Sequence, residues 1–498
     1  EQSRDLKRTA YEPRAPRTMG FEELSAKLEA VGQAHVLEHW ESLSDEEKDL
    51  LERQIYDIDS VVGLQTLRPM FDEALAMNDL QREGEIEGPP EEWTAYADGR
   101  NPDDELRWEG LGMELIAQGK CAACVLAGGM GTRLGTSFPK GMLGSSEVEE
   151  KFLPSQKSLF QIYAERILAM QRRAQKHAGL EEEPTIVFLV MTVDANHKVT
   201  TKFFQRNNYF GLRGDQVFFF RQGCMPCFST DGKMLLQSPF EIAVSPDGNA
   251  GVYTALRREG ILDRLQEAGV KWIQVFSVDN LLVRAADPVW YGYCEETEAD
   301  VCVKTVPKRD WSEAVGVVTL RGGAPSVIEY SEIGEARAQE ANEDGVLKYN
   351  AANICLQAYS LDFLCKPALE YKTIWHIARK DIPTIEGKQP GIKLEGFIFD
   401  VFEVAKTFRL LQVDRAAEFS AIKNASDSGK PDTPQTALAS LSRLHRSWLR
   451  QAGAPLPDDD ENGEGPICEV SPLLSYRGEN LEDVAGGVDS SGESILVQ

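Results

Sequence analysis

The chain has 498 residues, of which 42% are hydrophobic and 27% are charged. At about 100 to 200 residues per domain, this length allows two to four domains, and the composition excludes a wholly disordered, collagen-like or disulfide-stapled chain. No stretch reaches the ~18 consecutive apolar residues of a membrane span, and residues 1–30 contain no apolar signal core. We therefore expect a globular protein without a membrane partner, located in the cytoplasm unless an organelle imports it.

Acidic residues outnumber basic ones by 80 to 53, which gives a net charge of −27. Such a surface repels nucleic acid on average, so we expect no nucleic-acid partner. A phosphorylated ligand would need a local cluster of Lys, Arg and backbone N–H groups. The nine cysteines are an odd number in a chain without an apolar signal core, which favours reduced thiols.

The N-terminal region, residues 1–104, is predicted to be mainly helical. Apolar residues follow helical spacing at Phe21, Leu24, Leu28 and Val31. Ser44 and Glu47 form a capping-box pattern ahead of an acidic helix that runs toward Ile58. The segment 84–103 is rich in Gly, Pro and acidic residues, and we interpret it as a linker or surface loop.

The middle of the chain alternates between strand-like and helical patterns. Strand-like runs lie at 122–127, 185–193, 217–220, 272–278, 301–306 and 315–320. Helical patterns lie between several of them, notably at 158–175 and 251–266. Short apolar strands that alternate with helices predict a largely parallel sheet covered on both faces.

The composition shifts after Asn424. A polar stretch leads into a helical pattern at 438–451, and an acidic loop at 458–464 is followed by short strand-like pieces. These features predict a small C-terminal α+β module over residues 421–498. No internal repeat is evident in the sequence.

Two metal-like patterns have simpler interpretations. His35, Glu38 and His39 match an inverted zinc-protease motif, but we interpret them as a charged helix face. The Cys121/Cys124 and Cys224/Cys227 pairs are too far apart for a zinc ribbon, and the first pair lies in a predicted buried strand. Core packing is the favoured role, with redox or metal chemistry as the alternative. The six histidines form no hydrolase triad.

A Gly-rich loop directly follows the first predicted strand of the sheet. It reads LAGGMGTRLG from Leu126 onward and leads to Lys140. Close glycines let the backbone approach a ligand and point N–H groups at phosphate oxygens, and Arg133 and Lys140 add fixed positive charge. Leu134 replaces the last glycine of a Rossmann fingerprint, and no Walker Gly-Lys-Ser/Thr follows. The loop therefore predicts a phosphate or nucleotide site of another kind.

The segment LAGGMGTRLG…FPKGM resembles the signature of the UTP-dependent sugar-1-phosphate pyrophosphorylases, and more closely that of the eukaryotic UDP-N-acetylglucosamine pyrophosphorylases. Matching blocks follow in one order at 157–168, 221–226, 246–253, 277–282, 327–332, 350–353, 392–400, 418–424 and 469–476. Two positions depart from the family pattern. Met130 stands where the family usually has Gln, which could alter a nucleotide contact, and Ala250 stands where it usually has Gly.

The resemblance implies a reaction and a fold. UTP and N-acetylglucosamine 1-phosphate would give UDP-N-acetylglucosamine and pyrophosphate, with Mg²⁺, by direct in-line attack on the α-phosphate. The implied architecture is α/β, with a Rossmann-like nucleotidyltransferase central domain over 105–420 between the N-terminal region and the C-terminal module. We expect a monomer. The alternatives are a UDP-sugar pyrophosphorylase that takes glucose or galactose 1-phosphate, and a silent nucleotide-sugar sensor.

The resemblance also assigns roles to individual residues. The nucleotide-binding positions are Leu126, Ala127, Gly128, Gly129, Lys140, Gln222, Gly248, Asp279 and Lys393. The sugar-binding positions are Asn249, Glu329, Tyr330, Asn353, Phe397, Phe399 and Lys423. Arg133, Lys140 and Lys423 would be catalytic, and Lys423 would reach the phosphate as the C-terminal module closes.

Elementary chemistry agrees with several of these roles. An amide such as Gln222 offers the donor and the acceptor that a uracil edge needs. Asp279 ends a predicted strand, where ligands gather, and its carboxylate suits Mg²⁺; capping a helix is the structural alternative. Phe397 and Phe399 would wall the acetyl group, or else serve as strand core. Gly248 lies in a plain turn sequence.

Overall fold

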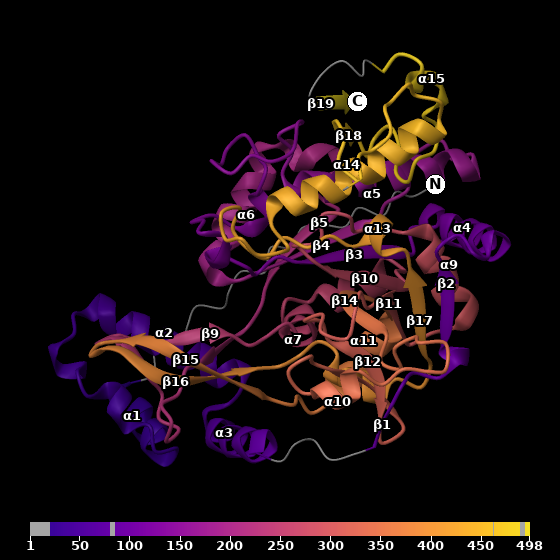
Figure 1. Ribbon diagram of the computed structural model, residues 1–498. Coiled ribbons are helices and arrows are strands. Elements are labelled where there is room, and N and C mark those ends of the chain that lie inside the picture. The colour runs from indigo at the N-terminus through magenta and orange to yellow at the C-terminus, as the bar shows by residue number, and fades with distance from the viewer. Residues whose placement is uncertain (1–19, 80–84, 462, 489–493) are drawn as a thin grey trace.

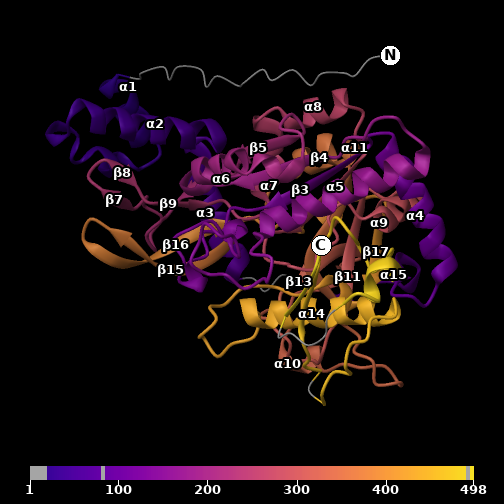
Figure 2. The same ribbon diagram turned by 90° about the horizontal axis from the view of Figure 1, so that it is seen from above.

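The computed structural model describes residues 20–79, 85–461, 463–488 and 494–498. A large twisted sheet occupies the centre, helices cover both of its faces, and α14 with β18 and β19 lies at one end (Figure 1). The N-terminal helices and the hairpin β15–β16 form a lobe at one side in both views (Figures 1 and 2). Within the described residues, no helix is long and apolar enough to span a membrane.

The central sheet has the strand order β2-β17-β11-β14-β10-β3-β4-β5. These strands are β2 (Thr94–Ala97), β3 (Cys121–Leu126), β4 (Val187–Thr192), β5 (Val217–Arg221), β10 (Trp272–Ser277), β11 (Val301–Pro307), β14 (Ala351–Ser360) and β17 (Phe408–Val413). Neighbours are parallel except at β14, which runs antiparallel to β10 and β11. The prediction of a largely parallel sheet is thus confirmed for these eight strands, among which β14 is the antiparallel exception. The strands that extend the sheet beside β14 also pair antiparallel.

The sheet is extended beside β14 by three further strands, which are β12 (Val317–Arg321), β13 (Ala324–Ile328) and β1 (Ile86–Glu87). All six strands predicted from the sequence are present. The interpretation of 84–103 as a linker is wrong for β2, which pairs in parallel with β17 at the edge of the sheet. Its hydrogen-bonding partner lies more than three hundred residues away in sequence, so local composition could not indicate it.

Helices pack on both faces because successive strand residues point to opposite sides. Along β3, Ala123 and Val125 belong to one core, and Ala122 and Cys124 belong to the other. The first core contains α4 (Pro102–Ala117), α5 (Leu159–Ala178), α6 (Asp194–Arg206) and α9 (Pro288–Thr297). The second contains α7 (Gly251–Arg258), α8 (Ile261–Glu267), α11 (Leu361–Cys365) and α12 (Pro367–Glu370).

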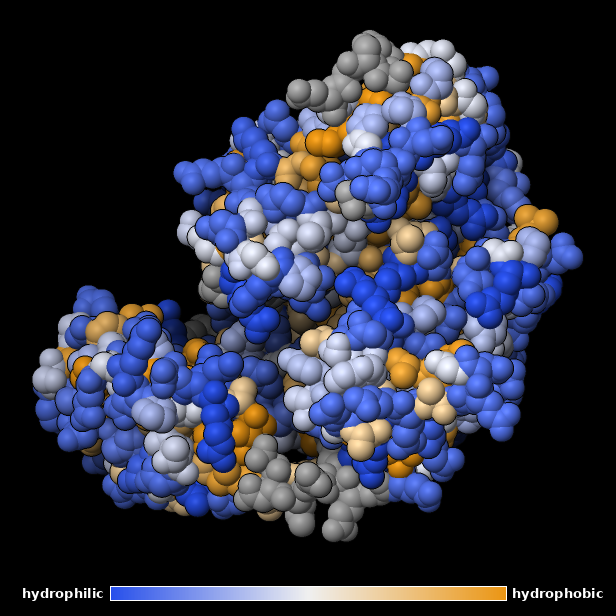
Figure 3. All heavy atoms as spheres, viewed as in Figure 1, coloured by the Kyte–Doolittle hydropathy of each residue, from blue (hydrophilic) through white to orange (hydrophobic). Residues whose placement is uncertain are grey.

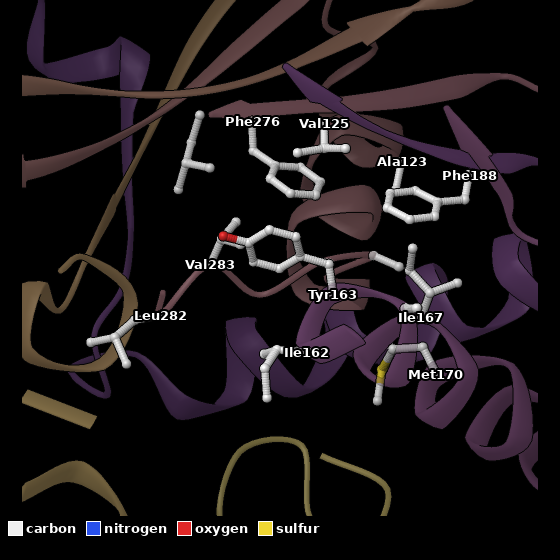
Figure 4. Close-up of a cluster of buried hydrophobic side chains, with 14 of the residues drawn as sticks. Ala123, Val125, Ile162, Tyr163, Ile167, Met170, Phe188, Phe276, Leu282 and Val283 are labelled. Carbon is white, nitrogen blue, oxygen red and sulfur yellow. The ribbon is translucent and has the colours of Figure 1, made fainter. Parts of the chain in front are cut away.

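Figure 4 shows the first core between the sheet and α5. Phe276, Val125 and Phe188 project from three strands toward Tyr163 and Ile167 of the helix. The Tyr163 hydroxyl donates to the carbonyls of residues 278 and 280, just after β10. This buried contact ties α5 to the loop at the carboxyl end of that strand.

Two predicted helices differ from the structure in their bounds. The predicted helix 158–175 is α5, whose Ser158 caps Gln161. The predicted helix 251–266 is two helices, because Gly260 takes the left-handed conformation (φ +65°) between α7 and α8.

The N-terminal helices are α1 (Phe21–Ala30), α2 (Asp45–Val61) and α3 (Leu64–Asp79), and the capping box at the start of α2 is present. They share one core with residues from later in the chain, such as Phe228 and Ile392. Those residues belong to or adjoin β6 (Cys224–Pro226), β7 (Leu236–Ser238), β8 (Glu241–Ile242), β9 (Val244–Pro246), β15 (His376–Thr384) and β16 (Gly387–Glu395). The lobe is therefore built from three separate stretches of sequence.

The zinc-like motif lies in this lobe. His35 belongs to a short 3₁₀ turn (Ala34–Leu37), and its Nε2 lies 2.7 Å from the carbonyl oxygen of Met234. The motif lies on successive 3₁₀ helices with Glu38 exposed, so the helical interpretation holds without an α-helix. His35 connects the turn to the loop after β6.

The C-terminal elements are α14 (Pro434–Gln451), β18 (Ile467–Val470), α15 (Glu482–Ala485) and β19 (Ser494–Val497). Helix α14 begins four residues earlier than predicted, at the Thr433 cap. Leu441 and Tyr476 join the first core beside α5, and Leu449 and Cys468 belong to a small separate core. The remaining short helices are α10 (Glu335–Ala338) and α13 (Arg415–Glu418).

The surface is mostly hydrophilic on the face shown in Figure 3, as the net charge leads one to expect. Its outline is indented between the N-terminal lobe and the body of the molecule. All nine cysteines are free thiols. Cys121 and Cys124 are buried in β3, which confirms the prediction that they lie in the core.

Candidate active site

The Gly-rich loop crosses the carboxyl edge of the sheet next to β4 and β5. The backbone N–H of Ala127 donates to the Met191 carbonyl (2.8 Å), and the Ala127 carbonyl accepts from Asn196 Nδ2 (3.0 Å). Gly128 faces Gln222, because a Cβ at position 128 would lie 3.1 Å from Gln222 Oε1. The loop is therefore fixed at its start, and its glycine permits the close approach of the Gln222 side chain.

Lys140 and Asp279 meet at this edge. The Lys140 N–H donates to the Gly129 carbonyl (3.2 Å), and Lys140 Nζ lies 3.7 Å from Asp279 Oδ2. Nζ also donates to the carbonyl of Ile422 (3.2 Å). The side chains of both residues of the pair are about four-fifths buried. Arg133, by contrast, is exposed on the same loop.

Asp279 follows β10 in a turn, so the alternative of a helix cap is wrong. The next helix, α9, is capped by Asp287 instead. The Asp279 carbonyl accepts from the Ile422 N–H (2.8 Å), and Asn280 pairs with Ala421. The carboxylate thus lies at the carboxyl end of a central strand, with Lys140 as its neighbour.

The segment 418–423 runs beside this turn. Asn280 Nδ2 donates to the Glu418 carbonyl (2.8 Å), and Asn280 Oδ1 accepts from the Ser420 N–H (2.9 Å). Lys423 comes next, with its N–H bound to the Asp432 carbonyl. The backbone before Lys423 therefore lies at the sheet edge, beside the turn that carries Asp279.

Gln222 follows β5, and its N–H donates to the Thr192 carbonyl at the end of β4 (2.8 Å). Its Nε2 donates to Asp247 Oδ1 (3.0 Å) and to the Gly248 carbonyl. Burial raises the pKa of Asp247 to about 7, although the Gln222 hydrogen bond opposes the shift. The sequence indicated only a turn around Gly248, since nothing local indicates that the neighbouring Asp247 is buried.

The turn at Gly248 is held against the start of the 396–400 segment. Gly248 has φ +86°, and a Cβ there would lie 2.2 Å from the Gly396 carbonyl oxygen. Asn249 Oδ1 accepts from the Ile398 N–H (2.8 Å). Lys393 lies three residues before Gly396 on β16, and its charge acts on the nearby Cys227 thiol. It therefore belongs to the hairpin side of the site.

Glu329 and Asn353 meet around Gly316. A Cβ at Gly316 would lie 3.0 Å from Glu329 Oε1, and the Gly316 carbonyl accepts from the Asn353 N–H (2.8 Å). Burial raises the pKa of the Glu329 carboxyl, with the charge of Lys423 acting in the opposite direction. Tyr330, the next residue, is 55% exposed. Glu329 and Asn353 are thus brought together, whereas Tyr330 faces solvent.

Cys355 lies among the charged members of the site. Its pKa is raised to about 12 by burial and by the negative charges of Asp279 and Glu329, whereas Lys423 lowers it. These opposing contributions place the two carboxylates and the lysine around one thiol. Asp279 from the predicted nucleotide side, and Glu329 and Lys423 from the predicted sugar side, therefore lie near Cys355.

Phe397 is half-buried and packs against the second core, and Phe399 is buried within that core. Their ring centroids are 5.2 Å apart. The His376 ring stacks on Phe397 at 3.9 Å, and His376 Nε2 lies 2.9 Å from Asp400 Oδ2. Asp400 also accepts from the Phe397 N–H (3.2 Å). Sequence reasoning missed His376, because it searched the histidines only for triads and metal motifs.

Comparisons with known proteins identify the family of the chain. Residues 102–454 match the family model described as UTP–glucose-1-phosphate uridylyltransferase. UDP-N-acetylglucosamine diphosphorylase 2 of Arabidopsis thaliana is 40% identical over 487 residues, covering 95% of this chain and 94% of its own length. UDP-N-acetylglucosamine pyrophosphorylase of Saccharomyces cerevisiae is 36% identical, covering 93% and 97%.

The crystal structure of uridine diphosphate N-acetylglucosamine pyrophosphorylase from Trypanosoma brucei in complex with an inhibitor superposes with a TM-score of 0.85 and 32% identity. It covers 97% of this chain and 99% of its own. The chain belongs to the UDP-N-acetylglucosamine pyrophosphorylase family. This confirms the resemblance seen in the sequence, and the parallel-rich sheet agrees with a nucleotidyltransferase-like fold. In the structure, Lys140, Asp279 and Gln222 lie at the carboxyl edge of that sheet.

Proposed function

We propose that the chain transfers uridylyl from UTP to N-acetylglucosamine 1-phosphate, giving UDP-N-acetylglucosamine and pyrophosphate. The observation that carries the proposal is the Lys140–Asp279 pair, held at the carboxyl edge of the sheet beside the Gly-rich loop and linked to Ile422. A lysine and a carboxylate there suit a triphosphate with its metal. The names of the similar proteins supply the substrate class.

In the proposed reaction, an oxygen of the sugar phosphate attacks the α-phosphorus in line. A new phosphorus–oxygen bond forms as the bond from the α-phosphorus to the bridging oxygen breaks, and pyrophosphate leaves with that oxygen. No covalent enzyme intermediate is needed, so positioning and neutralisation of charge account for catalysis. Lys140 would face the triphosphate, Lys423 the incoming phosphate, and the exposed Arg133 the outer end of the loop.

Mg²⁺ fits the donor set at Asp279. This cation takes oxygen ligands and usually keeps waters and substrate phosphates, so one partly accessible carboxylate suffices on the protein side. When bound, it would neutralise charge on the reacting phosphates. Lys140, whose Nζ lies 3.7 Å from Asp279 Oδ2, would add a fixed positive charge beside those phosphates.

The nucleotide would lie along the Gly-rich loop. The backbone of Leu126, Ala127, Gly128 and Gly129 would approach the uridine and its first phosphates, and Gln222 and Gly248 would contact the base. Lys393 would reach a phosphate from the hairpin side. The Gln222 side chain facing Gly128 supports this placement, because it aims the amide at the loop.

The sugar would lie between Asn249, Glu329 and Asn353, with Tyr330 at the rim. Phe397 would face the acetyl methyl, and Phe399 would support it from the core. The stacked His376 gives Phe397 a second support. An apolar wall here favours the acetamide over a hydroxyl, which distinguishes the proposal from a UDP-glucose-type enzyme.

We also propose that the protein is a monomer and that it acts in a cytosol-like compartment. We further propose that its three parts are divided at residues 104 and 420. The nine free thiols agree with a reducing compartment. The deciding experiment measures UTP-dependent pyrophosphate release across N-acetylglucosamine, N-acetylgalactosamine, glucose and galactose 1-phosphates. Highest kcat/KM with N-acetylglucosamine 1-phosphate is expected. Preference for glucose 1-phosphate would favour the UDP-sugar alternative, and binding without turnover would favour the silent sensor.

A further inference from the structure

The donor side of the Gln222 amide is fully used within the protein. Its Nε2 carries two hydrogens, and its two partners are Asp247 Oδ1 and the Gly248 carbonyl oxygen. A backbone carbonyl can only accept, so the nitrogen, not the oxygen, must face Gly248. The orientation of this amide is therefore fixed by chemistry, and no N–H of the side chain remains for a ligand.

Asp247 is held in place as firmly as the amide it contacts. It is only 5% exposed, its N–H donates to the Gly223 carbonyl (3.2 Å), and its carbonyl accepts from the Gly396 N–H (2.8 Å). Two glycines border the carboxylate, since a Cβ at Gly223 or Gly251 would lie 2.5 or 2.0 Å from a carboxylate oxygen. The second acceptor for Nε2 therefore sits in a cradle that leaves it little freedom.

The acceptor side of the amide points the other way. Gln222 Oε1 faces Gly128 of the Gly-rich loop, and no donor among the described residues reaches it. The Gln222 N–H is fixed to the Thr192 carbonyl, so the side chain cannot drift along the sheet edge. An amide oxygen at the edge of a site without a protein donor is completed by a ligand donor or by water.

We infer that Asp247 is a positioning residue, which holds the Gln222 carboxamide with its oxygen toward the nucleotide and so selects a base that carries an N–H at ring position 3. The inference rests on the proposed function and deepens it. Uracil meets the requirement, because N3–H is its one N–H donor once N1 carries the ribose. Cytosine presents a bare N3 lone pair there, and two acceptors would face each other.

The test measures kcat/KM for pyrophosphate release from N-acetylglucosamine 1-phosphate with UTP, CTP and N3-methyl-UTP. In the wild type, UTP should exceed both other nucleotides by about 10- to 100-fold or more, since each leaves Oε1 without its donor. Asp247→Asn keeps an acceptor oxygen for Nε2 and should retain the UTP/CTP ratio within about 3-fold. Asp247→Ala removes that acceptor and should lower the ratio about 10-fold, mainly through loss of UTP use.

Asp194→Ala is the matched control. It removes an exposed carboxylate that pairs with Arg221, the last residue of β5 and the residue before Gln222. It should leave the ratio unchanged. An unchanged ratio in Asp247→Ala, or use of N3-methyl-UTP as well as UTP by the wild type, overturns the inference while the proposed function stands. The analogue arm needs no variant, so misfolding of Asp247→Ala does not spoil the test. No pyrophosphate from any nucleotide overturns the proposed function itself.

Discussion

At the scale of single residues, the candidate site depends on side chains whose roles only their neighbours define. Asp279 was identified from its place after a strand, and its lysine neighbour agrees with a role at a triphosphate. Asp247 and His376 escaped notice because an Asp in a turn and an isolated His carry no local signal. Their importance comes from the partners Gln222 and Phe397, which lie 25 and 21 residues away in sequence.

Asp279→Asn should retain the fold and lose at least ~100-fold in kcat, because one ionic ligand near developing charge is removed. Thermal unfolding would confirm that the variant is folded, and initial rates over a Mg²⁺ titration would give kcat. Near-normal turnover at saturating Mg²⁺ would contradict the metal role of Asp279.

Asp247 should make the stability of the protein depend on pH. Its folded pKa of about 7 exceeds the ordinary 3.8, so the folded state binds the proton more tightly than the unfolded state. The contribution is present at low pH and is lost as pH rises from about 4 to about 7. Relative to Asp247→Asn, the wild type should lose about 2 kcal/mol of unfolding free energy between pH 5 and pH 8. Parallel urea titrations of both proteins check this, and equal pH dependence would contradict it.

Phe397→Ala should narrow the kcat/KM ratio between N-acetylglucosamine and glucose 1-phosphates by about 10-fold, because the acetyl methyl loses its apolar wall. Phe399→Ala serves as the comparison, since Phe399 is buried in the core and its loss should mainly reduce stability, by about 3 kcal/mol or more. Competition assays and chemical unfolding separate the two effects. Equal ratios in wild type and Phe397→Ala would exclude Phe397 from the sugar pocket.

At the scale of elements, the sequence predicted where strands lie better than it predicted which strands pair with one another. The six predicted strands are present because apolar runs between helices are a local signal. The edge strand β2 and the antiparallel β14 were not predicted. The first is four residues long in a polar context, and its parallel partner β17 is distant in the chain. The second takes its direction from the loops that surround it, which no periodicity encodes.

A buried charge cluster supports the segment that carries Lys423. Lys304 on β11 is 1% exposed and lies 2.5 Å from both Asp287 and Glu418, while Arg284 lies 3.0 Å from Glu418. Glu418 in turn begins the 418–423 segment that pairs with Asn280. Two positive and two negative charges balance, so removing one leaves an uncompensated buried charge.

Lys304→Met should therefore cost about 3–5 kcal/mol of unfolding free energy and lower kcat, because the 418–423 segment loses its anchor. Lys372→Met is the control, since Lys372 is 77% exposed in its pair with Glu73, and it should cost less than about 1 kcal/mol. Urea unfolding and steady-state kinetics measure both. A loss of stability without any change in kcat would show that the cluster does not position Lys423.

At the scale of the whole molecule, the site joins distant parts of a strongly acidic chain. Lys140 belongs to the loop after β3 and Lys423 follows α13, yet Lys140 Nζ binds the carbonyl of residue 422. With a net charge of −27, such lysines must offset both the protein field and the phosphates. This convergence could not be predicted from spacing, because it depends on how the sheet brings 279 and 422 together.

Lys140→Ala should impair UTP binding and turnover together, whereas Lys423→Ala should mainly impair use of the sugar phosphate, by on the order of 3 kcal/mol in kcat/KM. Lys423→Arg should recover only part, because a planar fork replaces a compact ammonium. Calorimetry with UTP and kinetics with both substrates separate the roles. Wild-type kcat/KM in Lys423→Ala would exclude Lys423 from catalysis.

The shared core of the N-terminal lobe has a consequence for biosynthesis. Helices α1 to α3 are made first, but part of the apolar surface that covers them comes from Phe228 and Ile392. On the ribosome, their apolar faces stay partly exposed while some three hundred further residues are translated. Such exposed apolar surface favours chaperone binding or aggregation. The order of synthesis thus opposes the order in which this core can close, and a fragment ending after α3 should stay largely unfolded.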